Sequence, residues 1–192
     1  MNKKYCSVIS FIGKSGSGKS YLANIASEIS GIPVYSHREA IADLLRMPIV
    51  NQIINLRMKC SNDDVENMTK QLRQKLSKTE LFFAFKLLNF KMKRDIDPNS
   101  PIIVAAQAQP RLHIVKDFGH HNLVVGDPSQ RLLKLAERDG ITESYAAQRT
   151  AFFEAFYDFD QFSYEHTWHN NYKTLPSGFE NYAESLKDLS MN

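Results

Sequence analysis

Cysteine and long apolar runs are both scarce in this chain, and each scarcity excludes a class of protein. Only two of the 192 residues are cysteine, Cys6 and Cys60, which is too few for a disulfide scaffold and favours a reducing compartment. Neither has further ligands at the spacing that a zinc site needs. No stretch approaches the roughly 20 apolar residues that cross a bilayer. We therefore expect a cytoplasmic protein with no membrane partner.

The chain also has little net charge. The net charge is +3, and lysine and arginine are scattered along the chain, so we expect no nucleic-acid groove and no nucleic-acid partner. With 43% hydrophobic residues the chain can bury a full core. Its length is typical of a single domain.

Glycine is sparse as well, yet three of the eight glycines fall within one short motif. The segment Gly13-Lys14-Ser15-Gly16-Ser17-Gly18-Lys19-Ser20 matches G-x-x-x-x-G-K-[ST], the phosphate-binding loop. Residues without a Cβ let the backbone turn tightly and bring its N–H groups against phosphate oxygens. The motif predicts a binding site for a nucleoside triphosphate, which we take to be ATP.

Each polar position of the motif suits one part of a bound ATP. Lys19 supplies a charge to the β- and γ-phosphates, and the Ser20 hydroxyl suits Mg²⁺, which prefers oxygen ligands. The helix that follows directs its unpaired N–H groups at the same phosphates. The predicted ATP-binding residues also include Lys14, Ser15, Ser17 and Tyr21.

Short apolar segments alternate with helical patterns along the rest of the chain. Strands are predicted at 6–12, 32–35, 102–106, 123–125 and 162–168, and a helix at 21–30 ends at Gly31. This alternation predicts an α/β fold with a parallel sheet and helices on both faces, which makes three layers.

The remaining helices are predicted from their apolar spacing and their caps. From 38 to 94 the pattern stays helical with no strand between, and further helices are expected at 111–118 and after Thr142 and Ser177. Asp127 caps a helix with Pro128 at its first position, and Gly140 ends it. We interpret His120 and His121 as loop residues beside a turn rather than as metal ligands.

Three arginines follow the fourth predicted strand, at Arg131, Arg138 and Arg149. Arg131 and Arg138 lie seven residues apart on one helix and therefore share a face. Arginines that close over a transferring phosphoryl group stabilise its charge, and a lid that carries them excludes water. We predict a catalytic lid at 131–150; the alternative is a solvated basic face.

Several segments together resemble dephospho-coenzyme A kinase and related archaeal and phage nucleotide kinases. They are the phosphate loop, Gly-Ile-Pro-Val at 31–34, Arg-Leu at 131–132, Arg-Asp-Gly-Ile-Thr-Glu at 138–143 and Ala-Gln at 147–148. The resemblance implies a P-loop fold with a five-stranded parallel sheet, a helical acceptor-binding region at 36–96 and a lid, all within one kinase domain at 1–192. It also implies ATP-dependent phosphoryl transfer to a nucleotide-like acceptor.

The same resemblance assigns further site residues. The segment 72–78 is similar to an acceptor-side segment of those kinases, so Arg73, together with Arg38, is assigned to acceptor binding. In the same kinases the turn after the fifth strand borders the adenine. Asn170 or Asn171 is therefore a candidate for contact with the base.

Two carboxylates that this resemblance leads one to expect are missing. Dephospho-coenzyme A kinases carry an aspartate just after the second strand, where this chain has Tyr-Ser-His-Arg-Glu at 35–39. A hydroxyl acceptor needs a general base, whereas a phosphate acceptor is already ionised. The departure favours a nucleoside monophosphate, unless His37 or Glu39 acts as the base.

The second missing carboxylate is that of a Walker-B motif. The third predicted strand is followed by Gln107 rather than a carboxylate, so Ser20 and water, or a carboxylate from elsewhere, must hold Mg²⁺. The missing carboxylates motivate one alternative function, a nucleotide-binding regulator that has lost catalysis. A further alternative is a nucleic-acid-dependent ATPase, which the size of the chain and its lack of a basic groove disfavour.

Overall fold

The computed structural model describes residues 8–36, 43, 87, 90–91, 94–97, 100–106, 120–154 and 163–190. The chain divides into two compact units. One combines Met1–Tyr35 with Asp97–Asn192, and the other is Ser36–Ile96. The predicted helices at 38–94 lie mostly, and the one at 111–118 entirely, outside the described residues.

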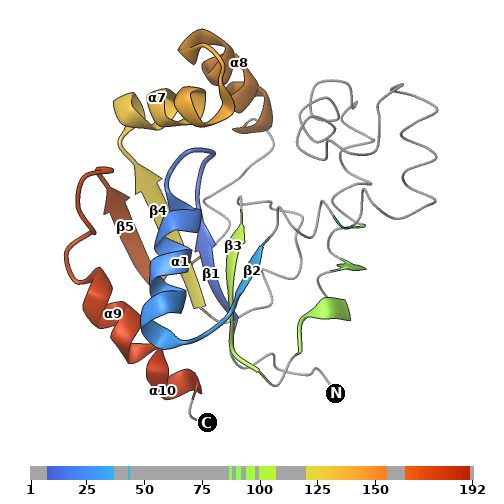
Figure 1. Cartoon of the computed structure of the whole chain (residues 1–192), viewed down its shortest axis with the longest axis vertical. Coiled ribbons are helices and arrows are strands. Elements are labelled where there is room, and N and C mark those ends of the chain that lie inside the picture. Colours follow the sequence, from blue (N-terminus) through green and yellow to red (C-terminus); the bar gives the residue numbers. More distant parts are fainter. Residues whose placement is uncertain are drawn as a thin grey trace. The chain divides into compact units, whose positions relative to one another are not determined.

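A five-stranded sheet forms the centre of the first unit (Figure 1). Its strands are β1 (Val8–Ile12), β2 (Val34–Ser36), β3 (Ile102–Ala106), β4 (His120–Gly126) and β5 (His166–Asn170). The spatial order is β2-β3-β1-β4-β5, and β1 pairs in parallel with both β3 and β4. The predicted α/β class with a five-stranded parallel sheet is confirmed.

Helices follow β1, β4 and β5 along the chain. They are α1 (Lys19–Ser30), α7 (Pro128–Asp139), α8 (Glu143–Glu154), α9 (Phe179–Ser185) and α10 (Lys187–Ser190). The α7 helix has the predicted bounds, because the Asp127 side chain caps its start and Gly140 adopts a left-handed conformation at its end. No helix in the described part of the chain is long and apolar enough to cross a bilayer.

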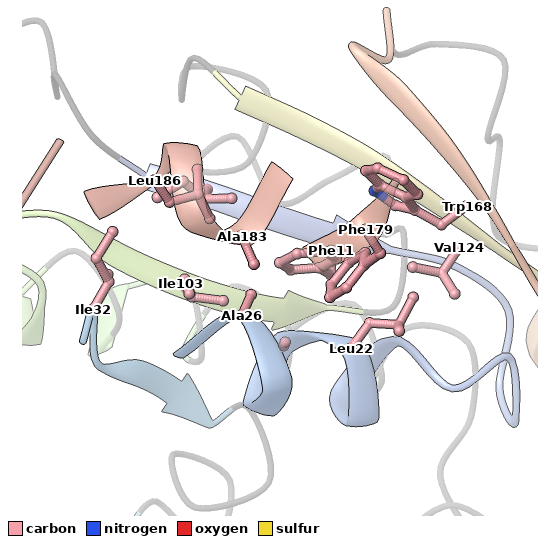
Figure 2. Close-up of a cluster of buried hydrophobic side chains, with 12 residues drawn as sticks. Phe11, Leu22, Ala26, Ile32, Ile103, Val124, Trp168, Phe179, Ala183 and Leu186 are labelled. Atoms are coloured by element: carbon pink, nitrogen blue, oxygen red, sulfur yellow. The ribbon is translucent and has the colours of Figure 1, made fainter. Parts of the chain in front are cut away.

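The main core lies between one face of the sheet and the helices α1 and α9 (Figure 2). All five residues of β1 are buried, as expected for a central strand of a parallel sheet. The rings of Phe11 and Phe179 lie 6.0 Å apart, and Trp168 meets Phe179 edge-on at 5.0 Å. We call this set the apolar layer; it comprises Ile9, Phe11, Leu22, Ala23, Ala26, Ile32, Ile103, Val124, Trp168, Phe179, Ala183 and Leu186.

A smaller cluster joins α7 to α8. Leu135, Ala136 and Ala146 are buried against one another, and Ile141 packs beside them. The two helices therefore form a hairpin over the segment predicted as the lid, and Figure 1 shows it beyond the carboxyl ends of β1 and β4.

Three strands differ from their predicted bounds in the described part of the chain; the first is β2, which spans Val34–Ser36 rather than 32–35. The interpretation of His120 and His121 as loop residues is wrong, because both belong to β4. Each finds a polar partner on a neighbouring segment: His121 Nδ1 lies 2.7 Å from Ser10 Oγ, and His120 Nδ1 lies 2.8 Å from a Glu165 carboxylate oxygen. The last strand begins at His166 rather than at 162, because its polar residues pair with β4 at the edge of the sheet.

Candidate nucleotide-binding site

The phosphate loop joins β1 to α1 at the carboxyl edge of the sheet. It turns through two left-handed glycines, Gly16 at φ 80° and Gly18 at φ 89°. Ser17 N donates to Lys14 O at 3.1 Å across the turn, and Gly18 forms the N-cap of α1. The predicted motif therefore forms a compact turn that opens directly into a helix N-terminus.

Neighbouring groups approach the motif glycines so closely that a side chain would not fit. A Cβ at Gly16 would lie 2.8 Å from the carbonyl oxygen of Arg131. A Cβ at Gly18 would collide with the side-chain amide of Asn170. Glycine at these positions thus serves the packing of the loop as well as the approach of a phosphate.

Three consecutive carbonyl groups of the loop accept hydrogen bonds from side chains outside it. The bonds are Arg131 Nη1 to Ser15 O (3.0 Å), Tyr172 Oη to Gly16 O (2.6 Å) and Asn170 Nδ2 to Ser17 O (2.9 Å). We call the three donors, Arg131, Asn170 and Tyr172, the carbonyl clamp. They come from α7 and from the end of β5, so two separate elements hold one loop.

The charged and hydroxyl groups of the motif lie at the start of α1. Lys19 Nζ donates to Lys14 O at 3.2 Å, so its side chain lies back over the loop. Ser20 is exposed, and Tyr21 is 53% exposed. Lysine and serine are thus held at a helix N-terminus, where they could meet phosphate oxygens and a metal ion.

The Ser17 side chain is enclosed within the loop. Its hydroxyl is fully buried and has no hydrogen-bond partner among the residues that the structure describes. A Cβ at Gly13 would lie 2.7 Å from this oxygen. Buried hydroxyl groups in proteins are normally paired. Because protein atoms enclose this hydroxyl, the groups left to meet a phosphate are the N–H groups at the N-terminus of α1 and the Lys19 side chain.

The three predicted lid arginines have different surroundings. Arg131 reaches the loop through Ser15 O. Arg138 instead pairs with Asp139, its Nε lying 2.8 Å from a carboxylate oxygen, and its side chain is 56% exposed. Arg149 belongs to α8, but its side chain is outside the described part of the structure. Of the two arginines whose side chains the structure describes, Arg131 therefore contacts the phosphate loop and Arg138 pairs with Asp139.

Of the other predicted site residues, one contacts the loop and three lie outside the described part of the chain. Asn170 donates to the loop and accepts from Tyr172 N at 2.9 Å, so both ends of its amide are engaged. Its contact with an adenine stays a prediction. His37, Arg38 and Arg73 lie outside the described residues, and their roles stay predictions as well.

Tyr172 is a residue of the site that the sequence patterns did not reveal. It is the one non-glycine residue with positive φ, 62°, in the described part of the chain. Burial is the main cause that raises the pKa of its hydroxyl to about 12. A Cβ at Gly126 would collide with this hydroxyl. The only sequence signal was a run of polar residues after a strand.

The described residues offer few candidate ligands for a metal ion. No group of three or more histidine, cysteine or acidic side chains that could hold a metal ion occurs among the described residues. The Asp127 carboxylate, just after β4, accepts from Ser129 N at 3.0 Å and Gln130 N at 3.1 Å. The Ser129 side chain and these amides hold the pKa of Asp127 below its usual value. This carboxylate therefore serves as a helix cap.

Comparison with known proteins shows which solved structures share this fold. No protein-family model and no curated protein matches the sequence. Among solved structures, TT1252 from Thermus thermophilus is 17% identical with a TM-score of 0.60, over 96% of each chain. A gluconokinase from Sinorhizobium meliloti 1021 is 16% identical with a TM-score of 0.52, over 98% of this chain and 95% of that one.

A dephospho-CoA kinase from Campylobacter jejuni is 12% identical with a TM-score of 0.52, over 96% of this chain and 97% of that one. The chain therefore has the fold of the P-loop kinases, and the resemblance that the sequence motifs indicated is confirmed. At these identities the likeness concerns the fold.

Proposed function

We propose that this protein is an ATP-dependent kinase that phosphorylates a small molecule. The observation that carries the proposal is the phosphate loop, which turns through left-handed Gly16 and Gly18 directly into the N-terminus of α1. A lysine and an exposed serine follow at the helix N-terminus. The fold shared with a gluconokinase and a dephospho-CoA kinase supports the reaction class.

Each group of the loop has a proposed task in phosphoryl transfer. Lys19 and the N-terminus of α1 hold the β- and γ-phosphates, and Ser20 holds Mg²⁺. A bound Mg²⁺ supplies positive charge that stabilises the transferring phosphoryl group. Arg131, Arg138 and Arg149 belong to the α7–α8 hairpin, and we assign to them the closure over that group.

We propose a nucleotide-like acceptor, either a (deoxy)nucleoside monophosphate or dephospho-coenzyme A. The segment 35–39 supports the first, because it lacks the aspartate that would take a proton from a hydroxyl. A phosphate acceptor needs no such base. Arg38 and Arg73 are the proposed acceptor ligands, and His37 is the proposed base if the acceptor is a hydroxyl.

An acceptor screen with ATP labelled on its γ-phosphate tests this function. Nucleoside monophosphates, dephospho-coenzyme A, gluconate and shikimate are offered in parallel, with Lys19→Ala as the control for the site. We expect label in one nucleotide-like product, with ADP formed in equal amount. ATP binding without transfer to any acceptor would favour a nucleotide-binding regulator. ADP formed without a labelled acceptor, and stimulated by DNA or RNA, would favour an ATPase.

A further inference from the structure

We propose that Tyr172 is a positioning residue for nucleotide binding, because its hydroxyl holds the Gly16 carbonyl and thereby orients the phosphate loop. The inference rests on the proposed function, in which this loop holds ATP. The hydroxyl lies 2.6 Å from Gly16 O, although 156 positions separate the two residues in the sequence. It is the central bond of the carbonyl clamp.

Peptide geometry explains how a bond to a carbonyl acts on the opposite side of the loop. In a planar trans peptide, the C=O of one residue and the N–H of the next point in opposite directions. Holding the carbonyls of Ser15 and Ser17 toward the clamp therefore directs the N–H groups of Gly16 and Gly18 away from it. Tyr172 holds Gly16 O between them, and the N–H group of that same peptide, Ser17 N, donates to Lys14 O across the turn.

The loop carbonyls are satisfied from end to end. Lys14 O accepts from Ser17 N and from Lys19 Nζ, and Gly18 O accepts from Leu22 N in the first turn of α1. The carbonyls between these two are those held by the carbonyl clamp. Without the Tyr172 hydroxyl, Gly16 O would lose this donor, and the bond from Ser17 N to Lys14 O would be left to hold the flexible Gly16–Ser17 peptide.

The backbone around Tyr172 is built to present its hydroxyl. A large side chain in the left-handed region is strained, and such strain persists only where neighbouring interactions impose it. The Asn170 side chain imposes it here, since its Oδ1 accepts from Tyr172 N at 2.9 Å. Gly126 leaves the space that the hydroxyl fills. Asn170 and Gly126, which lie far apart in the sequence, thus both help the Tyr172 hydroxyl to reach Gly16 O.

The direct test measures the loop without any nucleotide. Amide hydrogen exchange of the segment 13–20 is compared between the wild type and Tyr172→Phe, which keeps the ring but removes the hydroxyl. The control is Tyr182→Phe, which removes the hydroxyl that accepts from Asn122 at 2.7 Å in the apolar layer. We expect faster exchange at the loop in Tyr172→Phe and no change there in Tyr182→Phe. Unchanged exchange in Tyr172→Phe overturns the proposal, whatever the protein binds.

The second measurement is ATP affinity by calorimetry in the presence of Mg²⁺. Loss of one hydrogen bond that orients the loop is expected to raise the Kd about fivefold in Tyr172→Phe. The melting temperature should fall no further than in Tyr182→Phe. Tyr172→Gly removes the backbone strain together with the hydroxyl. If Tyr172 affected ATP binding only through that strain, this variant should bind ATP with the wild-type Kd. Our proposal predicts that it does not.

The outcomes separate this proposal from the proposed function. Wild-type affinity in Tyr172→Phe, with ATP binding abolished by Lys19→Ala, overturns the role of Tyr172 and leaves the kinase proposal intact. A wild-type protein that binds no ATP overturns the proposed function and, with it, the nucleotide part of this inference. Faster loop exchange together with weaker ATP binding supports both.

Discussion

The phosphate loop and the apolar layer meet at β1 and α1, but different interactions hold them. In the layer, Phe11 and Phe179 are fully buried, and apolar contact is their main interaction. In the loop, hydrogen bonds from the carbonyl clamp hold backbone groups that no apolar contact could fix. We therefore expect stability to depend mainly on the apolar layer and nucleotide affinity mainly on the adjacent loop.

The expected energies follow the same division. Truncating a buried aromatic side chain costs about 3–5 kcal/mol of stability, whereas one hydrogen bond contributes a net of about 0.5–1.5 kcal/mol. Substitutions in the layer should therefore unfold the protein before they alter the site. Substitutions in the loop should alter nucleotide affinity in a protein that stays folded.

The largest effect is expected in the layer. Phe179→Ala should lower the free energy of unfolding by about 3–5 kcal/mol, because the ring is buried against Phe11 and Trp168. Chemical denaturation measures this loss. The control is Phe90→Ala, at a side chain that is 70% exposed, which should change stability little. An equal loss in both variants would contradict the assignment of stability to the layer.

The next effect concerns the loop alone. Lys19→Ala should weaken ATP binding about 10- to 150-fold, because it removes a charge-assisted contact to phosphate worth about 1.5–3 kcal/mol. Calorimetry measures the affinity, and the melting temperature should stay close to that of the wild type. Lys134→Ala is the matched control, since Lys134 pairs with Glu137 on the exposed surface of α7. Equal ATP affinities in the two variants would contradict the assignment of the ATP site to this loop.

Two arginines of α7 are expected to affect ATP binding and catalysis differently. Arg131→Ala should raise the Kd for ATP, because it removes the donor to Ser15 O. Arg138→Ala should leave that Kd unchanged and lower kcat and kcat/KM together by about tenfold, as expected when a charge acts in the transition state. Steady-state kinetics and calorimetry separate the two. A wild-type kcat in Arg138→Ala would return Arg138 to the solvated-face interpretation.

The smallest effect concerns a polar group buried within the sheet, His121. Burial lowers the pKa of His121, with Glu165 raising it and His120 lowering it to a smaller extent. The unfolded chain then binds more protons than the folded one below the ordinary histidine pKa of about 6.5. Stability from this group is complete above that pH and is lost as the pH falls through the folded pKa. Urea denaturation at several pH values should show a weaker acid loss in His121→Gln; an unchanged slope would contradict this.

Local signals explain how far the sequence predicted the fold. The strand β3 has its predicted bounds, and α7 begins and ends where Pro128 and Gly140 indicate. A continuous apolar run, a helix cap and a left-handed glycine all act within a few residues. The start of β4 was missed because the His121 side chain is satisfied by Ser10, 111 positions away.

In the candidate site, too, local features could be predicted from the sequence and long-range contacts could not. The phosphate motif lies in one short segment, so its residues could be named from the sequence. Tyr172 and Asn170 act on backbone carbonyls, which carry no sequence signal of their own. Their contribution depends on the pairing of β5 with β4, which brings the end of β5 beside the loop.

The distance in sequence between the loop and its clamp has a kinetic consequence. Asn170 and Tyr172 lie 153 and 156 positions from the carbonyls that they hold, and such long-range contacts form slowly because a large loop must close first. During synthesis, the complete motif is present long before its clamp emerges from the ribosome. We therefore expect ATP affinity to develop late, so that binding of a nucleotide reports a completed fold and cannot assist its earliest steps.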